Sequence, residues 1–223
     1  MPDYTAMDLL NDADVRVLGS LIEKELTTPE HYPLSLNALT NACNQSSNRD
    51  PVVQYDDATV KAAVDRLRKY SLVRSIQRTD ARVMKYMHLF GDAMGVERPE
   101  LAAMCVLMLR GPQTAGEIRT RSGRLYEFPS LEDVDATLNR LIARSPDPLA
   151  TRLARQPGQK EARFAHLLSG EVTVDASAAA IHARAVEEDA PDRLGALETT
   201  VDVLRAEVAE LRSEIAEFRR LLE

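Results

Sequence analysis

A polar run at residues 44–51 carries groups that hydrogen-bond phosphate. It reads Asn-Gln-Ser-Ser-Asn-Arg-Asp-Pro and has no apolar side chain except the proline. Side-chain amides, hydroxyls and guanidinium groups are usual donors to the phosphate oxygens of DNA. The candidate phosphate contacts in this run are Asn44, Gln45, Ser46, Asn48 and Arg49. An ordinary polar surface turn has the same composition, so both interpretations stay open.

The next segment, residues 56–90, predicts an amphipathic helix followed by a basic β-hairpin. Apolar or small side chains recur at the spacing of one helix face, at Val60, Val64, Leu67 and Ser71. Asp56 or Asp57 can cap the start of the helix, because a carboxylate accepts from the free N–H groups there. Two β-like stretches then flank a break at residues 79–81. This order is typical of the DNA-reading part of a winged helix-turn-helix.

Basic side chains on the outward face of this helix and on the hairpin complete the candidate DNA contacts. Ala58 and Ala62 on the same face would let the backbone approach a groove, and Arg66 could bind a guanine edge or a phosphate. Asp65 on this face speaks against that reading. The predicted contacts are Lys61, Arg66 and Lys69 on the helix and Arg78 and Arg82 on the hairpin, which Arg74 and Lys85 would also line.

The helix and the hairpin both recur in the second half of the chain. Val60, Val64 and Leu67 correspond to Val134, Leu138 and Leu141, Arg66 corresponds to Arg140, and the strand 85–89 corresponds to 163–167. A matched helix and a matched strand in the same order indicate two copies of one module. The second helix carries more carboxylates, among them Asp133 and Asp135, and is predicted to be the poorer DNA reader.

The last segment predicts a coiled coil. Apolar residues alternate at steps of three and four over four heptads, at Leu194, Leu197, Val201, Leu204, Val208, Leu211, Ile215, Phe218 and Leu222. β-Branched residues at the first heptad position and leucine at the fourth favour two parallel strands, so these residues are predicted to join a homodimer. An amphipathic helix docked on its own domains is the alternative.

The predicted fold class is therefore α+β and mainly α. Two tandem winged helix-turn-helix domains are followed by a C-terminal coiled-coil helix. The predicted boundaries are a flexible lead-in at 1–11, winged-helix domains at 12–91 and 96–169, a linker at 170–191 and the coiled coil at 192–223. A break with two glycines and a proline at residues 91–99 separates the two domains.

Composition and motifs exclude several classes of function. The net charge of −7 comes from the tail, which leaves the two modules near neutral. Without a signal peptide or an apolar run that could span a membrane, a cytoplasmic protein without membrane contact is expected. Cys43 and Cys105 lie in apolar helical contexts, which predicts buried thiols. No catalytic motif or metal-ligand spacing is found, so neither an enzyme nor a cofactor is expected.

Three segments resemble a known family. Residues 41–52 (NACNQSSNRDPV), 82–89 (RVMKYMHL) and 122–134 (SGRLYEFPSLEDV) are similar to signatures of the YceH family of bacterial tandem winged-helix proteins. The resemblance covers roughly residues 15–168. It implies the fold and a cytoplasmic bacterial setting, and it brings no catalytic residues.

Two functions from different classes fit these observations. The first is a DNA-binding protein, a transcriptional regulator that reads DNA as a homodimer with the third helix and wing of its first domain. The alternative is a non-enzymatic adaptor or structural protein whose tandem winged helices bind protein partners, because a fold alone does not decide function.

Overall fold

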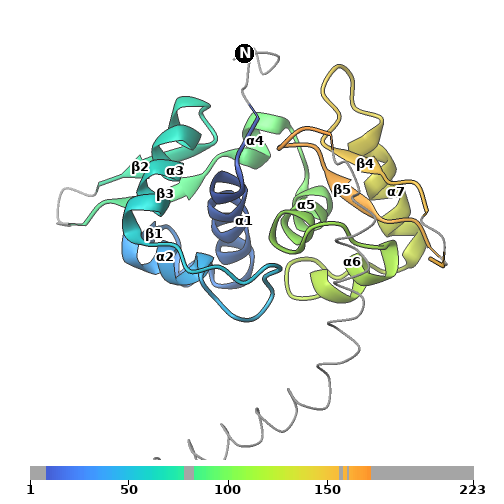
Figure 1. The fold of residues 1–223 in the computed structure, drawn as a ribbon, viewed down its shortest axis with the longest axis horizontal. Helices are drawn as coiled ribbons and strands as arrows, with labels where there is room; N and C mark the ends of the chain where they lie inside the picture. The colour runs from blue at the N-terminus through green and yellow to red at the C-terminus, as the bar shows by residue number, and fades with distance from the viewer. Residues whose placement is uncertain (1–8, 78–82, 156–157, 160, 172–223) are drawn as a thin grey trace, which may run out of the picture. The chain divides into compact units, whose positions relative to one another are not determined.

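The first half of the chain builds three helices and a small antiparallel sheet. The computed structural model describes residues 9–77, 83–155, 158–159 and 161–171. Its elements in this half are α1 (Asp12–Thr27), η2 (Pro29–His31), β1 (Leu34–Ser35), α2 (Leu36–Cys43), α3 (Asp57–Lys69), β2 (Val73–Ile76) and β3 (Lys85–His88). The strands are ordered β1-β3-β2, with β3 antiparallel to both neighbours (Figure 1).

The second half repeats three helices and an antiparallel strand pair. Its elements are α5 (Arg98–Arg110), α6 (Ala115–Ser122), α7 (Leu131–Ile142), β4 (Ala150–Arg152) and β5 (Phe164–His166), and α4 (Phe90–Met94) joins the halves. Gln113, just before α6, forms an isolated antiparallel bridge to Phe164 of β5. This bridge occupies the place in the second half that the pairing of β1 with β3 occupies in the first. The described residues thus form a mixed α+β fold that is mainly helical, which confirms the predicted class at that level.

Side-chain caps define where most of these helices begin. The N-cap side chains of Asn11, Ser35, Asp56, Thr114 and Ser130 each accept a hydrogen bond from a backbone N–H of the first turn. Such caps satisfy donors that have no partner within the helix. The predicted cap at Asp56 is confirmed.

The ends of two predicted segments differ from expectation. The third helix ends at Lys69, and Ser71 has a φ of 57° in the left-handed region, so Ser71 does not extend the apolar face. The predicted break at 91–99 overlaps α4, whose Phe90 and Met94 are buried in the core. Gly95, with a φ of 58°, ends that helix in the conformation that glycine adopts most easily.

The two halves pack against each other through α1 and α5, which lie side by side at the centre of Figure 1. The helices are close at Gly19 of α1, since a Cβ added there would lie 2.9 Å from Leu109 Cδ2 and 3.1 Å from Met108 Cβ. The Cys105 thiol also lies 3.5 Å from the Gly19 carbonyl oxygen. One hydrophobic core runs through both halves as a result.

The segment expected to be a flexible lead-in takes part in this packing. Leu10 is buried, and its N–H donates to the Leu168 carbonyl oxygen across the two halves. Asn11 caps α1, while residues 1–8 lie outside the described residues. The lead-in prediction is therefore corrected for Leu10 and Asn11, because these residues have partners far along the chain.

Several predictions concern residues that the structure does not describe. The coiled coil at 192–223, with all nine predicted dimerisation residues, lies outside the described part, and so does the linker from residue 172 onward. Within the described part of the chain, no helix has both the length and the apolar character needed to cross a membrane.

Candidate nucleic-acid interface

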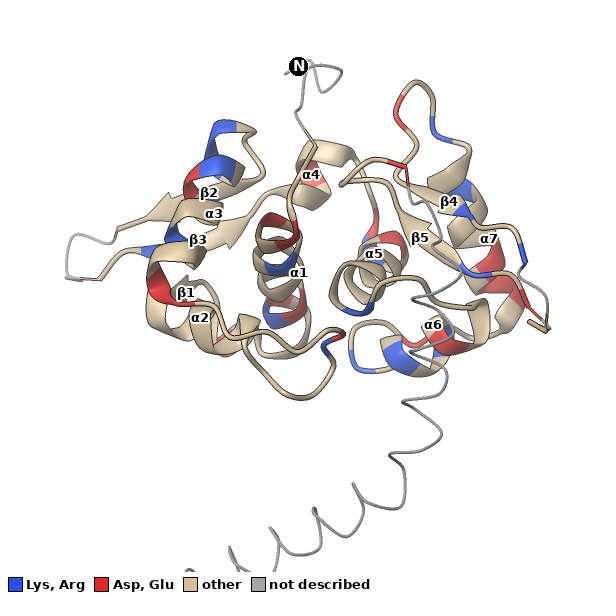
Figure 2. Ribbon diagram, viewed as in Figure 1, with Lys and Arg blue, Asp and Glu red and all other residues tan. Residues whose placement is uncertain are grey.

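The third helix of the first half buries one face and exposes the other. Val60, Val64 and Leu67 are fully buried against α1 and α2, as the periodicity predicts. On the opposite face Ala58 and Ala62 are exposed, and Lys69 is exposed at the C-terminal end. This face therefore carries small side chains at Ala58 and Ala62, and Figure 2 shows basic residues towards the C-terminal end of α3.

Ion pairs on this surface reduce its positive charge. Lys61 Nζ lies 2.5 Å from Asp65 Oδ2, and Arg68 Nη1 lies 3.5 Å from Asp65 Oδ1. The hydrogen bond from Lys61 lowers the pKa of the Asp65 carboxyl, with a smaller contribution from Arg68. Exposed pairs of this kind are worth well under about 1 kcal/mol, so Lys61 and Arg68 can exchange Asp65 for a phosphate.

The sheet adds two further basic side chains on one face. Val73, Tyr86 and His88 are buried, and the alternation along the strands puts Arg74 and Lys85 on the opposite, exposed side. Arg74 pairs across the ladder with Met87, and Lys85 pairs with Ile76, so Arg74 and Lys85 occupy diagonal positions on the same face of the sheet. The predicted contacts Arg78 and Arg82 lie outside the described residues.

Arg66, the residue predicted to read DNA, is held by another helix. Its Nε donates to Asp14 Oδ1 at 2.9 Å, and the Asp14 side chain is only 3 % exposed. Asp14 also completes the capping box of α1 with Asn11. Leaving a buried carboxylate unpaired destabilises a protein more than leaving an exposed one unpaired. The main role of Arg66 is therefore to hold α3 against α1.

The second half contains an equivalent ion pair. Arg140 Nε of α7 lies 3.0 Å from Glu100 Oε1 of α5, and Glu100 completes the capping box that begins at Glu97. An arginine on the third helix thus holds an acid in the first turn of the first helix, once in each half. The recurrence of an arginine at positions 66 and 140 was a sequence signal for these ion pairs. α7 is acidic and poorly suited to reading bases, so a structural role explains the arginine in both halves better than DNA reading does.

We expect Arg66→Ala and Arg140→Ala each to lower the free energy of unfolding by about 1–3 kcal/mol, because each leaves a largely buried carboxylate without its main partner. Urea denaturation followed by circular dichroism measures this. Lys69→Ala, at an exposed position of α3, is the control and should change stability by less than about 0.5 kcal/mol. If Arg66→Ala leaves the free energy of unfolding unchanged, the ion pair with Asp14 contributes nothing to stability.

The polar run at 44–51 folds back onto the protein at two of the predicted contacts. Asn44 Nδ2 donates to the Tyr55 carbonyl oxygen, and Asn44 Oδ1 accepts from the Tyr55 N–H, both at 2.8 Å. This paired contact closes the loop between α2 and α3. The amide is thereby used within the protein, which corrects the prediction that Asn44 is free to bind phosphate.

Arg49 is a second correction, because it is buried. Its guanidinium is bidentate on Glu23, with Nη1–Oε1 at 3.1 Å and Nη2–Oε2 at 2.7 Å. It also donates to the Ala42 carbonyl oxygen and to the Gln45 side chain. The Arg49 side chain is 0 % exposed. An arginine this enclosed cannot reach a phosphate without unfolding its surroundings.

The remaining residues of the run are at the surface. Ser46 is exposed, Gln45 is half-buried, and the exposed Asn48 accepts a hydrogen bond of 2.6 Å from Arg110 of the second half. Of the predicted phosphate contacts in this run, Ser46 is exposed and available to a ligand. The loop around Asn48 faces the second half.

His88 and both cysteines are buried within the described part of the chain. His88 Nε2 lies 2.5 Å from Glu25 Oε2, and the His88 N–H donates to the Tyr32 hydroxyl. Burial lowers the pKa of His166 to about 4. Cys43 and Cys105 are buried free thiols, as predicted, and burial raises the pKa of Cys43 to about 11, so its thiol is a poor nucleophile.

Comparison with known proteins finds relatives across most of the chain. Residues 10–159 match a family described as "Protein of unknown function, DUF480". A UPF0502 protein of Opitutus terrae is 52% identical over 77% of this chain and 74% of its own length. A UPF0502 protein of Pelobacter propionicus is 50% identical over 90% of this chain and 92% of its own length. One of Aliivibrio salmonicida is 44% identical over 92% of this chain and 96% of its own length. The family match runs from just before α1 to beyond β4, and ends before β5.

Proposed function

This chain belongs to the DUF480 family of bacterial proteins, whose function is unknown, and from its own geometry we propose that it binds DNA. The contact surface in this proposal is the exposed face of α3 together with the outer face of β2 and β3. We define this surface as the α3–sheet surface, with the basic side chains Arg68, Lys69, Arg74 and Lys85.

A winged-helix reading of each half supports the proposal. Each half has three helices followed by two antiparallel strands, in that order along the chain. In the first half, β1 between α1 and α2 adds the third strand that such domains commonly have. In helix-turn-helix proteins the recognition helix enters the major groove. We therefore assign α3 to that position, in agreement with the resemblance to the YceH family.

The observation that carries the proposal is the basic end of this surface. Arg68 and Lys69 are exposed where α3 ends, and Arg74 and Lys85 are exposed on the sheet that follows it. The exposed alanines Ala58 and Ala62 would let the α3 backbone approach a groove. Arg66, held by Asp14, contributes less to base reading than the sequence suggests, so phosphate contacts should dominate affinity.

We expect Lys69→Ala to weaken binding of duplex DNA on every sequence. Each phosphate contact contributes about −0.9 to the slope of log affinity against log salt concentration. Loss of one contact should therefore make that slope shallower by about one. Fluorescence anisotropy with random duplexes at several salt concentrations measures the slope. Arg155→Ala removes the same charge from an exposed position on the second half and should leave the slope unchanged.

Failure of the unaltered chain to bind any duplex at low salt would reject the proposal. Equal effects of Lys69→Ala and Arg155→Ala would mean that net charge, and not the α3–sheet surface, governs binding.

A protein partner is the second candidate, and two exposed apolar side chains favour it. Val83 is 57% exposed and Met84 38% exposed, immediately before β3. The outward face of α7 in the second half is acidic, with Glu132, Asp133 and Asp135 all exposed, which suits a basic protein better than DNA. Self-association through the heptads from Leu194 to Leu222 is also proposed, on their spacing alone.

A further inference from the structure

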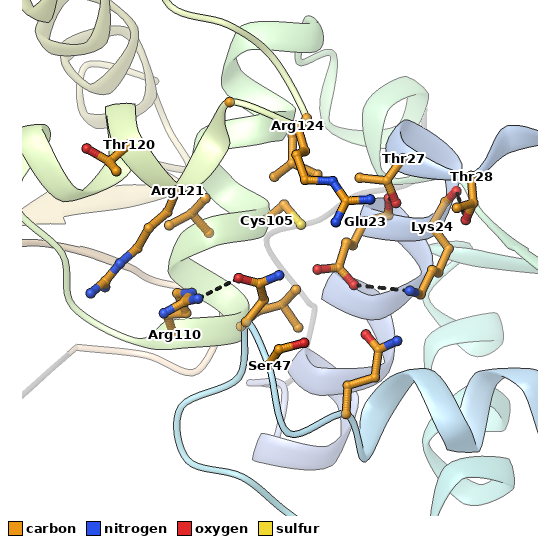
Figure 3. A pocket seen from close by; sticks show the side chains of 16 residues that line it. Glu23, Lys24, Thr27, Thr28, Ser47, Cys105, Arg110, Thr120, Arg121 and Arg124 are labelled. Carbon is orange, nitrogen blue, oxygen red and sulfur yellow. Dashed lines mark hydrogen bonds and ion pairs between the residues drawn. The ribbon is translucent and has the colours of Figure 1, made fainter. Parts of the chain in front are cut away.

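A polar cavity of about 410 Å³ lies where the two halves meet, away from the α3–sheet surface. The first half contributes the C-terminal end of α1 and the 45–48 loop, and the second contributes α5 and the segment from the end of α6 to Leu125. Its walls therefore exist only because α1 packs on α5. The polar loop with Ser47 and the segment with Arg121 and Arg124 are more than 70 residues apart in the chain, and they meet at this cavity (Figure 3).

The charge of the cavity wall is strongly positive. Lys24, Arg110, Arg121 and Arg124 line it, and Glu23 is its one acidic lining residue. The Glu23 charge is matched by Arg49, whose buried guanidinium binds both carboxylate oxygens. Glu117, which does not line the cavity, lies 3.7 Å from Arg121 and offsets part of one charge. Lys24 Nζ also lies 3.9 Å from Glu23 Oε2, an ion pair that Figure 3 marks with a dashed line. Most of the excess positive charge of the wall therefore comes from Arg110, Arg121 and Arg124.

Two of these cations are crowded together. Figure 3 shows Arg110 and Arg121 on the same side of the cavity. Burial lowers the pKa of Arg110, and repulsion by Arg121 is the next contribution. Arg110 is oriented by its 2.6 Å hydrogen bond to Asn48 of the other half. Bringing like charges together costs free energy, and an anion between them would recover it.

The rest of the wall suits an organic phosphate better than a bare ion. The Ser47 hydroxyl can donate a hydrogen bond to a phosphate oxygen, whereas the hydroxyls of Thr27 and Thr120 already donate to the carbonyl oxygens of Glu23 and Gly116. Val106 and Leu109 add apolar surface. The volume is within the range of about 300–1,000 Å³ that holds small organic ligands and is far larger than one phosphate needs.

We propose that this cavity binds a small organic phosphate of nucleotide size, with its phosphate groups held by Arg110, Arg121, Arg124 and Lys24. Arginine is suited to this task because its planar guanidinium can bind phosphate oxygens in a bidentate manner. Since both halves supply ligating groups, the bound molecule would also stabilise the α1–α5 contact.

Isothermal titration of the full chain with ATP and with sodium pyrophosphate, in EDTA and at constant ionic strength, tests the site. We expect a single saturable site for ATP with a dissociation constant below about 1 mM, and weaker binding of pyrophosphate. Arg121→Gln and Arg124→Gln change exposed side chains and should each lower ATP affinity about tenfold or more. Arg155→Gln, an equal charge change outside the cavity, should bind ATP like the unaltered chain.

A parallel titration with a random duplex separates this site from DNA binding. We expect the two cavity variants to bind duplex within about twofold of the unaltered chain, because the α3–sheet surface is intact in both. Three results would overturn the proposal: no ATP binding at about 1 mM, an Arg155→Gln effect equal to that of Arg121→Gln, or cavity variants that lose duplex affinity while the chain ignores ATP.

Discussion

Arg49→Met is expected to lower the free energy of unfolding by about 3–5 kcal/mol, because it leaves the carboxylate of Glu23 without its buried partner. Both oxygens of that carboxylate accept from the Arg49 guanidinium, and the Glu23 side chain is only 11% exposed. Small proteins have about 5–15 kcal/mol of stability in total, so this change would bring the fold close to unfolding at room temperature. Urea denaturation followed by circular dichroism measures it.

A double variant distinguishes the lost pair from a general effect of the substitution. In Glu23→Leu with Arg49→Met the unpaired charge is absent, so we expect most of the lost stability to return. Arg155→Met, at an exposed position, is the matched control and should change stability by less than about 0.5 kcal/mol. If Arg49→Met is as stable as the unaltered chain but binds DNA more weakly, Arg49 lies at the surface as its sequence context suggested.

Gly19→Leu is expected to disrupt the packing between the two halves. Even the Cβ of the new side chain would meet Leu109 Cδ2 at 2.9 Å and Met108 Cβ at 3.1 Å, and the rest of it has no space between the helices. Overpacking of a core costs about 1–3 kcal/mol and more when helix backbones must separate. The better helix propensity of leucine offsets less than about 1 kcal/mol of this. Thermal unfolding and protease sensitivity of the full chain measure the loss.

Gly116→Leu is the matched control, since Gly116 is also a helical glycine. An added Cβ there meets only Thr114 Oγ1, at 3.9 Å, which is ordinary contact. We expect this variant to be as stable as the unaltered chain or slightly more stable. Because the cavity walls come from both halves, Gly19→Leu should also weaken ATP binding, whereas Gly116→Leu should not. Equal stability of the two variants would contradict a close contact at Gly19.

The local elements of this protein could be predicted from its amino-acid pattern. The spacing of Val60, Val64 and Leu67 predicted the third helix, and β-like residues predicted β2 at Val73–Ile76. An aspartate cap indicated where the third helix begins, and the repeat predicted that the second half has the same elements. These features depend on neighbours a few residues apart, so periodicity and capping patterns are sufficient to identify them.

Short elements with distant partners were less predictable. The strand β1 has two residues, and it forms because Leu34 and Ser35 pair with Tyr86 and Lys85 of β3. The helix α4 lies in a segment whose glycines indicated a break, and the burial of Phe90 decides its structure. In both cases the stabilising contact comes from tertiary packing, which no local pattern reports.

Which polar side chains are available to a ligand depends on contacts between distant parts of the chain. Asn44, Arg49 and Arg66 have the residue types of DNA contacts, yet their partners are Tyr55, Glu23 and Asp14. An arginine at the surface and an arginine in a buried ion pair look the same in a sequence, because the difference is the desolvation set by distant residues. The cavity between the halves likewise exists only where α1 meets α5, so packing alone brings the basic side chains that line it together.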